Sequence, residues 1–196
     1  TGIPGVGKST FINQFGKLTL TDSPNTQLGI LTIDPSSPLA GGSILGDKTR
    51  MHELASYEQV FIRPSPSTQI SGGLAPRTRE AMLLLEAAGF NLIFIESVGV
   101  GQAEDDIAHL VDFVFLLIMP ATGDELQGLK KGLVELADFI LINKSDNDLE
   151  KSALRTKSIL AHTLTQHTYL KTISSVYQRG LAELWSKLNE LTNDPK

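Results

Sequence analysis

The sequence predicts a single α/β domain in which a mainly parallel sheet carries helices on both faces. The chain has 196 residues, of which 41% are apolar and 20% are charged, and this composition is ordinary for one globular domain. Six short runs are almost continuously apolar, as in strands that are buried on both faces. Segments with helical patterning alternate with these runs, and a helix is the usual connection between parallel strands. We therefore expect one domain over residues 1–196.

Each element follows from a local pattern in the sequence. The apolar runs predict strands at residues 29–34, 60–63, 91–96, 113–119, 139–143 and 169–174. The other segments predict helices at residues 8–15, 77–88, 103–111, 127–137, 149–164 and 181–191, with glycines at 89 and 180 next to helix ends. Ligands of such sheets bind at the carboxyl ends of the strands, so the polar loops after the strands are the candidate sites.

The chain opens with the phosphate-binding pattern Gly-x-x-x-x-Gly-Lys-Ser, which fills Gly2 to Ser9. The glycines let backbone N–H groups converge on phosphate oxygens, Lys8 can reach the β- and γ-phosphates, and the Ser9 hydroxyl can bind Mg²⁺. The alternative is a glycine-rich turn that leads into a helix. We expect nucleotide contacts from Gly5, Val6, Gly7, Lys8, Ser9 and Thr10.

This pattern begins at the second residue of the chain, so the sequence lacks the strand that normally leads into such a loop. We interpret this as a boundary of the given chain and expect the chain to be a fragment of a longer protein. An extension before Thr1 is expected to raise both the stability of the domain and its affinity for the nucleotide.

A second polar loop, "NKSD", follows the predicted strand at 139–143. The Asp146 carboxylate can accept two hydrogen bonds, and guanine offers its N1–H and its exocyclic amine side by side, whereas adenine does not. Lys144 would lie along the base plane, and Asn143 would contact the other edge of the ring or hold the phosphate loop. Ser174 and Ser175, after the last strand, could contact the same base through their backbone. The alternative for this loop is a solvated turn before a helix.

A third loop, "ESVGVGQ", follows the predicted strand at 91–96. Glu96 has the position expected of an acid on the Mg²⁺ side of the nucleotide. Gly99 has the position expected of a glycine whose N–H contacts the γ-phosphate. Val100 takes the place after the glycine where small GTPases carry glutamine, and the glutamine is displaced to Gln102, so we expect slow intrinsic hydrolysis. The alternative is a glycine-rich turn between a strand and a helix.

Two further acids are candidates for the metal or the attacking water. Asp34 ends a predicted strand, and Asp47 ends a loop that is rich in Gly, Pro and Ser; a capping role is the alternative for each. We expect residues 34–46 to become ordered on binding of the γ-phosphate. The catalytic candidates are therefore Lys8, Asp34 and Glu96, and the metal candidates are Ser9, Asp34, Asp47 and Glu96.

Composition argues against several other classes. The net charge of −5 is unlike that of a protein held on nucleic acid by phosphate contacts. There is no cysteine, so disulfides and thiolate chemistry are excluded, and the four histidines are scattered along the sequence. The longest apolar run, residues 113–120, is too short to span a bilayer. We expect neither a nucleic acid nor a membrane as a partner.

Together these motifs resemble the MeaB/ArgK/MMAA family of P-loop GTPases. The resemblance covers residues 2–185 and is most specific in the blocks "GIPGVGKSTFI", "TIDPSSPLAGGSILGDKTRM", "GGLAPRTRE", "ESVGVGQAE" and "TGDELQGLKKGLVELADFILINKSD". It implies a fold of the SIMIBI class and a slow GTPase that binds GTP, GDP and Mg²⁺. It also implies a chaperone that gates delivery of adenosylcobalamin to methylmalonyl-CoA mutase, or a related mutase, and protects that enzyme.

By the same resemblance, residues 34–50, 96–102 and 121–131 match the family's switch regions. The location would be cytoplasmic, or the mitochondrial matrix in a eukaryote. Family members form homodimers to which a helical arm after the last helix contributes; that arm, the first strand and an N-terminal helical extension are absent from this sequence.

Two other functions are compatible with the same fold group. A nickel-delivery GTPase for hydrogenase or urease would need a Cys-rich or His-rich metal site, and the sequence has no cysteine. A phosphotransferase linked to basic amino-acid transport would need a pocket for a phosphate acceptor and a catalytic base. Binding of Ni²⁺ or transfer of labelled phosphate would separate these functions from a regulatory GTPase.

Overall fold

The fold was analysed in a computed structural model that describes residues 1–34, 51, 53–66, 75–97, 107–120, 131–164 and 168–193. The strands are β1 (Leu28–Asp34), β2 (Val60–Pro66), β3 (Leu92–Glu96), β4 (Phe115–Ile118), β5 (Phe139–Ile142) and β6 (Tyr169–Thr172). The α-helices are α1 (Lys8–Asp22), α3 (Ala75–Ala87), α6 (Lys131–Leu136), α7 (Glu150–Ala161) and α8 (Leu181–Asn193), and the short 3₁₀ helices are η1 (Leu54–Ser56) and η2 (Asn147–Leu149). All six predicted strands are confirmed.

The strands form two parallel three-stranded sheets in the orders β2-β1-β3 and β4-β5-β6. Leu28 of β1 is in register with Val60 and Leu92 of its two neighbours, and Phe139 of β5 is in register with Phe115 and Tyr169. Because all strands within a sheet run in one direction, their carboxyl ends share one edge. The predicted parallel arrangement is confirmed.

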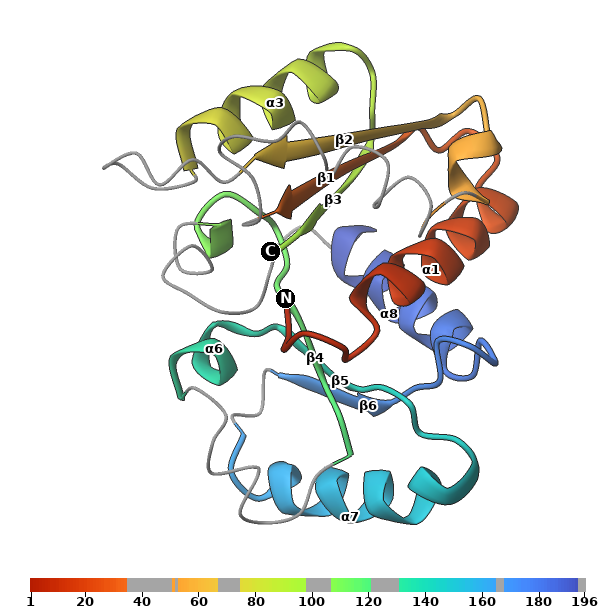
Figure 1. Ribbon diagram of the computed structural model, residues 1–196, viewed down its shortest axis with the longest axis vertical. Helices are drawn as coiled ribbons and strands as arrows, with labels where there is room; N and C mark the ends of the chain where they lie inside the picture. The colour runs from red at the N-terminus through yellow and green to blue at the C-terminus, as the bar shows by residue number, and fades with distance from the viewer. Residues whose placement is uncertain are drawn as a thin grey trace.

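Thr1 lies beside β4, between the two sheets (Figure 1). Its ammonium group donates to the carbonyl of Phe115 at 2.8 Å, and the Leu117 N–H donates to the carbonyl of Thr1 at 2.9 Å. This is the hydrogen-bond pattern of a parallel strand pair. A cavity of about 360 Å³ is lined by β3, by Thr1 and by Phe11 and Phe15 of α1. Thr1, which leads into the phosphate loop, is therefore paired with β4.

Helices cover both faces of the sheets, as predicted (Figure 1). On one face α1 and α8 share a core with β1, β4 and β5, in which Phe15, Phe139 and Leu184 are fully buried. Burying one such side chain contributes about 1.5–3 kcal/mol. On the other face α3 packs on β1 through Ala81 and Leu85, while α7 packs on β4 and β5.

Helix α1 is longer than predicted, because the sequence interpretation ended it at residue 15 and it continues to Asp22. In the structure Gly16 allows close packing: a Cβ there would lie 2.9 Å from side-chain atoms of both Leu28 and Leu54. The predicted helix at 127–137 is observed over Lys131–Leu136, and of the one at 103–111 the described part begins at residue 107.

Candidate functional site

The phosphate loop has the backbone conformation that its glycines allow. Gly5 and Gly7 have φ angles of 80° and 98°, in the left-handed region that other residues rarely adopt. A Cβ on Gly7 would also lie 2.8 Å from Nδ2 of Asn143. The loop leads directly into α1, which begins at Lys8, so its N–H groups and the positive end of the helix lie together. This arrangement can bind an anion such as a phosphate.

The side chain of Lys8 folds back onto the phosphate loop. Its Nζ donates to the carbonyl of Gly2 at 2.7 Å and to that of Ile3 at 3.3 Å. The ammonium group is therefore held at the loop, where phosphate oxygens would bind. A nucleotide would replace these carbonyl partners by stronger, charged acceptors.

Ser9, on the first turn of α1, contacts Glu96 at the carboxyl end of β3. The Ser9 hydroxyl donates to Glu96 Oε1 at 2.9 Å. The structure thus brings together two residues that are 87 positions apart in the sequence and that were predicted to share a metal. Two oxygen ligands on adjacent corners of an octahedral Mg²⁺ site would be roughly 2.9–3.0 Å apart, so the observed spacing fits such a site.

Asn143 connects the phosphate loop to the loop after β6. Its Nδ2 donates to the Val6 carbonyl at 2.9 Å, and its Oδ1 accepts from the Ser175 N–H at 3.0 Å and the Ser175 hydroxyl at 2.8 Å. The side chain is only 2% exposed, so these bonds are shielded from water. Of the two roles that the sequence left open for Asn143, the described geometry is that of a residue that holds the phosphate loop.

Asp146 is held by the loop after β6. The Ser174 hydroxyl donates to Asp146 Oδ2, and Ser174 Oγ in turn accepts from the N–H of Tyr177 at 3.3 Å. Asn147 donates to Asp146 Oδ1 at 3.3 Å. Ser174 is fully buried, so the carboxylate is fixed from one side. Sequence reasoning expected backbone contacts from Ser174 and did not identify its hydroxyl as a support for the carboxylate.

The loop after β6 is itself closed by a pair of backbone bonds. Ser174 and Arg179 exchange two N–H···O bonds of 3.1 Å each. Lys144, in the loop after β5, has a φ of 58°, which is uncommon for a residue other than glycine and turns the chain sharply between Asn143 and Asp146. The closed loop after β6 and the sharp turn at Lys144 therefore fix the position of Asp146.

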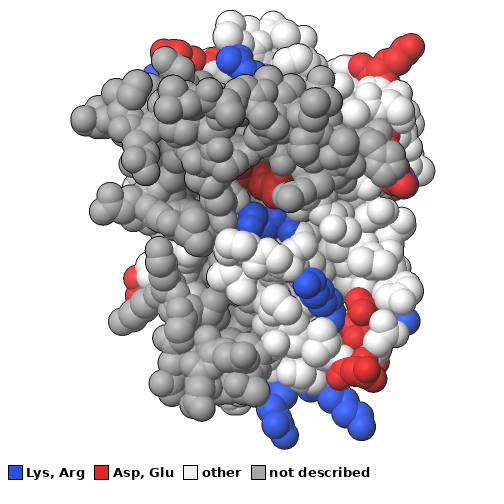
Figure 2. Space-filling model, viewed as in Figure 1, with Lys and Arg blue, Asp and Glu red and all other residues white. Residues whose placement is uncertain are grey.

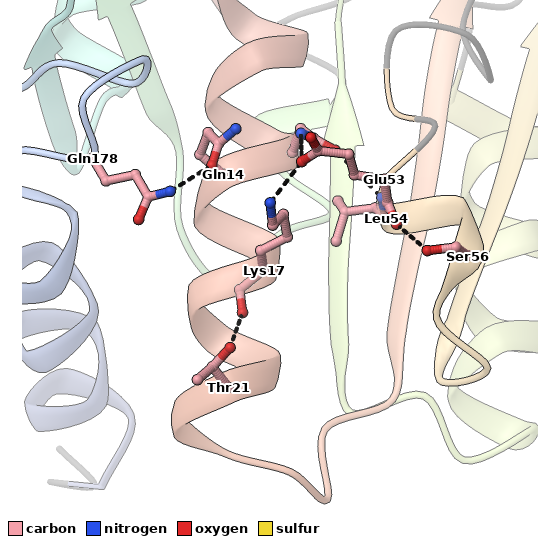
Figure 3. A network of polar contacts seen from close by, with 8 residues as sticks. Gln14, Lys17, Thr21, Glu53, Leu54, Ser56 and Gln178 are labelled. Atoms are coloured by element: carbon pink, nitrogen blue, oxygen red, sulfur yellow. Dashed lines mark hydrogen bonds and ion pairs between the residues drawn. The ribbon is translucent and has the colours of Figure 1, made fainter.

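Polar contacts hold α1 on both of its flanks (Figure 3). Lys17 forms an ion pair of 2.6 Å with Glu53, the residue before η1. On the other flank, Gln178 Nε2 donates to Gln14 Oε1 at 2.8 Å. Gln178 belongs to the closed loop that also carries Ser174. The helix that starts with Lys8 is thus linked to the loop behind Asp146, a connection that no motif in the sequence indicated.

Three predicted site residues are only partly described or lie outside the described residues. Asp34 ends β1 at the same sheet edge as Glu96 of β3, and only its backbone position is described. Asp47 and Gly99 lie outside the described residues. Among the described residues, no group of three or more His, Asp or Glu side chains is placed to hold a metal ion. No helix in the described part of the chain is long and apolar enough to cross a membrane.

Comparison with known proteins identifies relatives of this chain. Residues 1–194 match the family model described as methylmalonyl Co-A mutase-associated GTPase MeaB. The chain is 49% identical over 196 residues to a putative GTPase of Caulobacter vibrioides and 45% identical over 193 residues to GTPase ArgK of Escherichia coli. It covers 59% and 58% of those two proteins, and they align with 96% and 94% of this chain.

Further matches include a mouse protein and solved structures. The mouse protein, named methylmalonic aciduria type A homolog, mitochondrial, is 44% identical over 201 residues, which cover 97% of this chain and 47% of that protein. A crystal structure titled LAO/AO transport system kinase matches with a TM-score of 0.77 at 34% identity, over 98% of this chain and 57% of that one. HypB from Helicobacter pylori, in complex with nickel, matches with a TM-score of 0.67 at 17% identity, over 97% and 83% of the two chains, and this likeness shows the fold alone.

Proposed function

The chain belongs to the family of methylmalonyl Co-A mutase-associated GTPases called MeaB, and on this basis we propose that it binds and hydrolyses GTP. The observation that carries the proposal is the convergence of the phosphate loop, Glu96 and Asp146 at one edge of a fold shared with this family. The chain spans about half to three fifths of the length of the relatives that it matches. The activity is therefore proposed for the domain that these residues form.

The phosphates would bind to the loop from Gly2 to Ser9. Its backbone N–H groups, the start of α1 and the Lys8 ammonium supply positive potential where the β- and γ-phosphates would lie. Lys8 already lies at this loop, so binding requires only an exchange of its partners. During hydrolysis the same groups would stabilise the charge that develops on the transferred phosphoryl oxygens.

Ser9 and Glu96 would hold Mg²⁺, with Asp34 and Asp47 as further candidate ligands. The support for this is the 2.9 Å separation of the Ser9 and Glu96 oxygens and the preference of Mg²⁺ for oxygen ligands. When bound, Mg²⁺ neutralises part of the phosphate charge. In this chain Ser9 would exchange its hydrogen bond to Glu96 for the metal.

Asp146 would recognise guanine. Its carboxylate is held by Ser174 and Asn147, and an ionised carboxylate retains further acceptor sites for the N1–H and amine of the base. Adenine would place a lone pair against the carboxylate. The nucleotide is therefore proposed to be GTP or GDP rather than an adenine nucleotide.

A mutase that depends on adenosylcobalamin would be the partner. The support is the description of the matching family and the names of the relatives, since a mouse relative is named for methylmalonic aciduria type A. We propose that GTP binding and hydrolysis by this domain gate delivery of the cofactor to that enzyme and protect it. In this process the residues of this chain would bind and hydrolyse GTP.

Turnover of GTP in the presence of the partner tests this proposal. Phosphate release is measured from the domain with GTP and Mg²⁺, alone and with methylmalonyl-CoA mutase, and the Lys8→Ala variant serves as the background control. Slow release that rises with the mutase is expected. Absence of both GTP binding and phosphate release would contradict the GTPase proposal. Intact turnover without a complex or a rise would contradict the partner, and labelled phosphate on a protein or small molecule would indicate a kinase.

A further inference from the structure

A side-chain bridge joins the tip of the loop after β6, residues 176–179, to helix α1. Gln178 Nε2 donates to Gln14 Oε1 at 2.8 Å, across 164 positions of the sequence. Figure 3 shows the two amides pointing toward each other, one from the loop and one from a flank of α1. Among the described residues, this is the one hydrogen bond that joins the tip to an element outside its own loop. The bridge therefore fixes where the tip lies against α1.

Gln178 has a backbone conformation that glycine adopts more easily. Its φ is 56°, in the left-handed region. In the part of the chain that the structure describes, the other non-glycine residues with a positive φ are Lys144 and Asn147, which follow β5 at the same end of the site. Strain of this kind persists where the surroundings hold it, and it gathers at functional sites. The strain at Gln178 therefore indicates a use for its side chain, and the observed use is the bond to Gln14.

Helix α1 is the fixed side of the bridge. Phe15 of α1 is fully buried in the core, and Lys17 forms an ion pair with Glu53 on the other flank of the helix. The tip of the loop is exposed by comparison, with Val176 at 68% and Tyr177 at 55% exposure. A contact between a packed helix and an exposed tip constrains the tip more than the helix. The bridge therefore positions the loop.

The positioned loop also holds Asp146. The Ser174 hydroxyl donates to the Asp146 carboxylate, and Ser174 exchanges two backbone bonds with the residue that follows Gln178. On the other side of the bridge, Lys8 lies in the same helix as Gln14, roughly 9 Å away along the axis at 1.5 Å per residue. Contacts from Gln14 through Gln178 and Ser174 thus connect the carboxylate at the base end to the helix that carries the lysine of the phosphate end.

We propose that Gln14 and Gln178 are positioning residues that set the spacing between the base end and the phosphate end of the nucleotide site. The inference rests on the proposed function, because it takes Asp146 and Lys8 as the groups at these two ends. A guanine nucleotide that spans both ends binds more tightly when their spacing is fixed in advance, since less order must be created on binding. Inorganic pyrophosphate reaches the phosphate end alone and gains nothing from this spacing. The bridge therefore favours the whole nucleotide.

Binding of GDP and of inorganic pyrophosphate to bridge variants tests the inference. Gln14→Ala and Gln178→Ala each raise the Kd for GDP about fivefold, as loss of one hydrogen bond does. The double variant loses no more than either single variant, because both remove the same contact. The Kd for pyrophosphate stays at the wild-type value in all three.

Gln59→Ala is the matched control, since the Gln59 side chain donates to the Pro24 carbonyl at 3.1 Å, near the amino ends of β1 and β2. It is expected to bind GDP as the wild type does. Wild-type affinity for GDP in both Gln14→Ala and Gln178→Ala overturns the inference. A loss of pyrophosphate affinity as large as the loss for GDP also overturns it.

Two further variants separate positioning from a purely structural role. Gln178→Gly adopts the same φ without strain, so it keeps the Tm of the wild type while its Kd for GDP rises about fivefold. Gln14→Lys combined with Gln178→Glu replaces the amide contact by an ion pair and restores wild-type affinity. A lower Tm in Gln178→Gly that accounts for its loss of affinity overturns the positioning role, as does a charged pair that binds GDP as weakly as the double alanine variant. A wild-type chain that binds no GDP contradicts the proposed function itself, so the two failures are distinguishable.

Discussion

The two ends of the proposed nucleotide site differ in how their polar groups are hydrogen-bonded. At the base end, formed by residues 143–146 and 174–179, the side chains of Asn143, Ser174 and Ser175 are buried, with exposures of 2%, 0% and 2%. Their hydrogen bonds are made within these two loops and to the carbonyl of Val6. At the phosphate end, Lys8 and Ser9 are paired with groups that a nucleotide and its metal would replace. The base end is organised when the chain folds, whereas the phosphate end must exchange partners on binding.

This difference predicts which variants change the free energy of unfolding and which change the affinity for the nucleotide. A buried donor or acceptor that loses its partner costs about 1–3 kcal/mol, and this cost appears in folding. A half-buried lysine such as Lys8 that turns from a carbonyl to a phosphate changes the binding free energy and leaves folding nearly unchanged. Removal of the Asn143 side chain at the base end should therefore affect unfolding and binding together, and removal of the Lys8 side chain at the phosphate end should affect binding alone.

Lys8→Ala is expected to have the largest effect, on affinity. Removal of the ammonium group deletes hydrogen bonds to charged phosphate, each of which contributes about 1.5–3 kcal/mol, so the Kd for GTP rises by roughly 100-fold or more. Calorimetric titration with GTP gives the affinity, and the Tm should change little. The control is Lys187→Ala on α8, an exposed lysine that pairs with Glu190. An equal loss of GTP affinity in Lys187→Ala would contradict the assignment of phosphate binding to Lys8.

Asn143→Ala is expected to lower the free energy of unfolding by about 2–3 kcal/mol. The substitution leaves the Val6 carbonyl and the Ser175 N–H without their buried partner, and it frees the phosphate loop from the loop after β6. Urea unfolding followed by the fluorescence of the single tryptophan, Trp185, gives the value. A variant as stable as the wild type would show that the buried bonds of Asn143 do not organise the base end.

Gly7→Ala is expected to cost about 1–2 kcal/mol of unfolding free energy. An alanine must adopt a φ of 98°, and its Cβ would lie 2.8 Å from Nδ2 of Asn143. Gly89→Ala is a matched control, because Gly89 has a φ of 90° with no atom within 4 Å of the added Cβ. The excess cost of Gly7→Ala over this control measures the contact with Asn143. Equal costs in the two variants would mean that the phosphate loop accommodates the added Cβ without strain against Asn143.

Ser174→Ala is expected to have the smallest effect, a rise of about fivefold in the Kd for GTP. The variant removes one hydrogen bond to the Asp146 carboxylate, which keeps its bond from Asn147, and the loss of one such bond is on the order of 1 kcal/mol. Fluorescence titration with a labelled GDP gives the affinity. Ser56→Ala, which removes a remote side-chain bond to the Glu53 carbonyl, is the control. Equal affinities for the wild type and Ser174→Ala would leave Ser174 without a part in base recognition.

The sequence predicted the strands well because each is an almost continuous apolar run. Phe139 to Ile142 is buried at every position, as a strand covered on both faces must be. Helix α1 continues past its predicted end at residue 15, through Gly16, whose missing side chain lets the helix pack closely against Leu28 and Leu54. Local propensity fails where a tertiary contact requires the residue that it disfavours.

The sequence named candidate residues of the site but not the contacts between them. Motif spacing identified Lys8, Ser9, Glu96 and Asn143 as candidates, since each follows a recognisable strand or loop pattern. The pattern could not decide between two roles for Asn143 or reveal that the Ser174 hydroxyl holds Asp146, because these contacts span 137 and 28 residues. Such contacts depend on how the strands pair.

The most direct test of base recognition compares GTP and XTP as ligands of the wild type and of Asp146→Asn. Xanthine carries a carbonyl where guanine has its amine, so an asparagine amide can donate to XTP where the carboxylate is repelled. Buried hydrogen-bond mismatches of this kind discriminate by up to roughly 10⁴. The wild type is predicted to prefer GTP and Asp146→Asn to prefer XTP, with similar Tm values. An unchanged preference for GTP in Asp146→Asn would contradict the assignment of Asp146 as the residue that reads guanine.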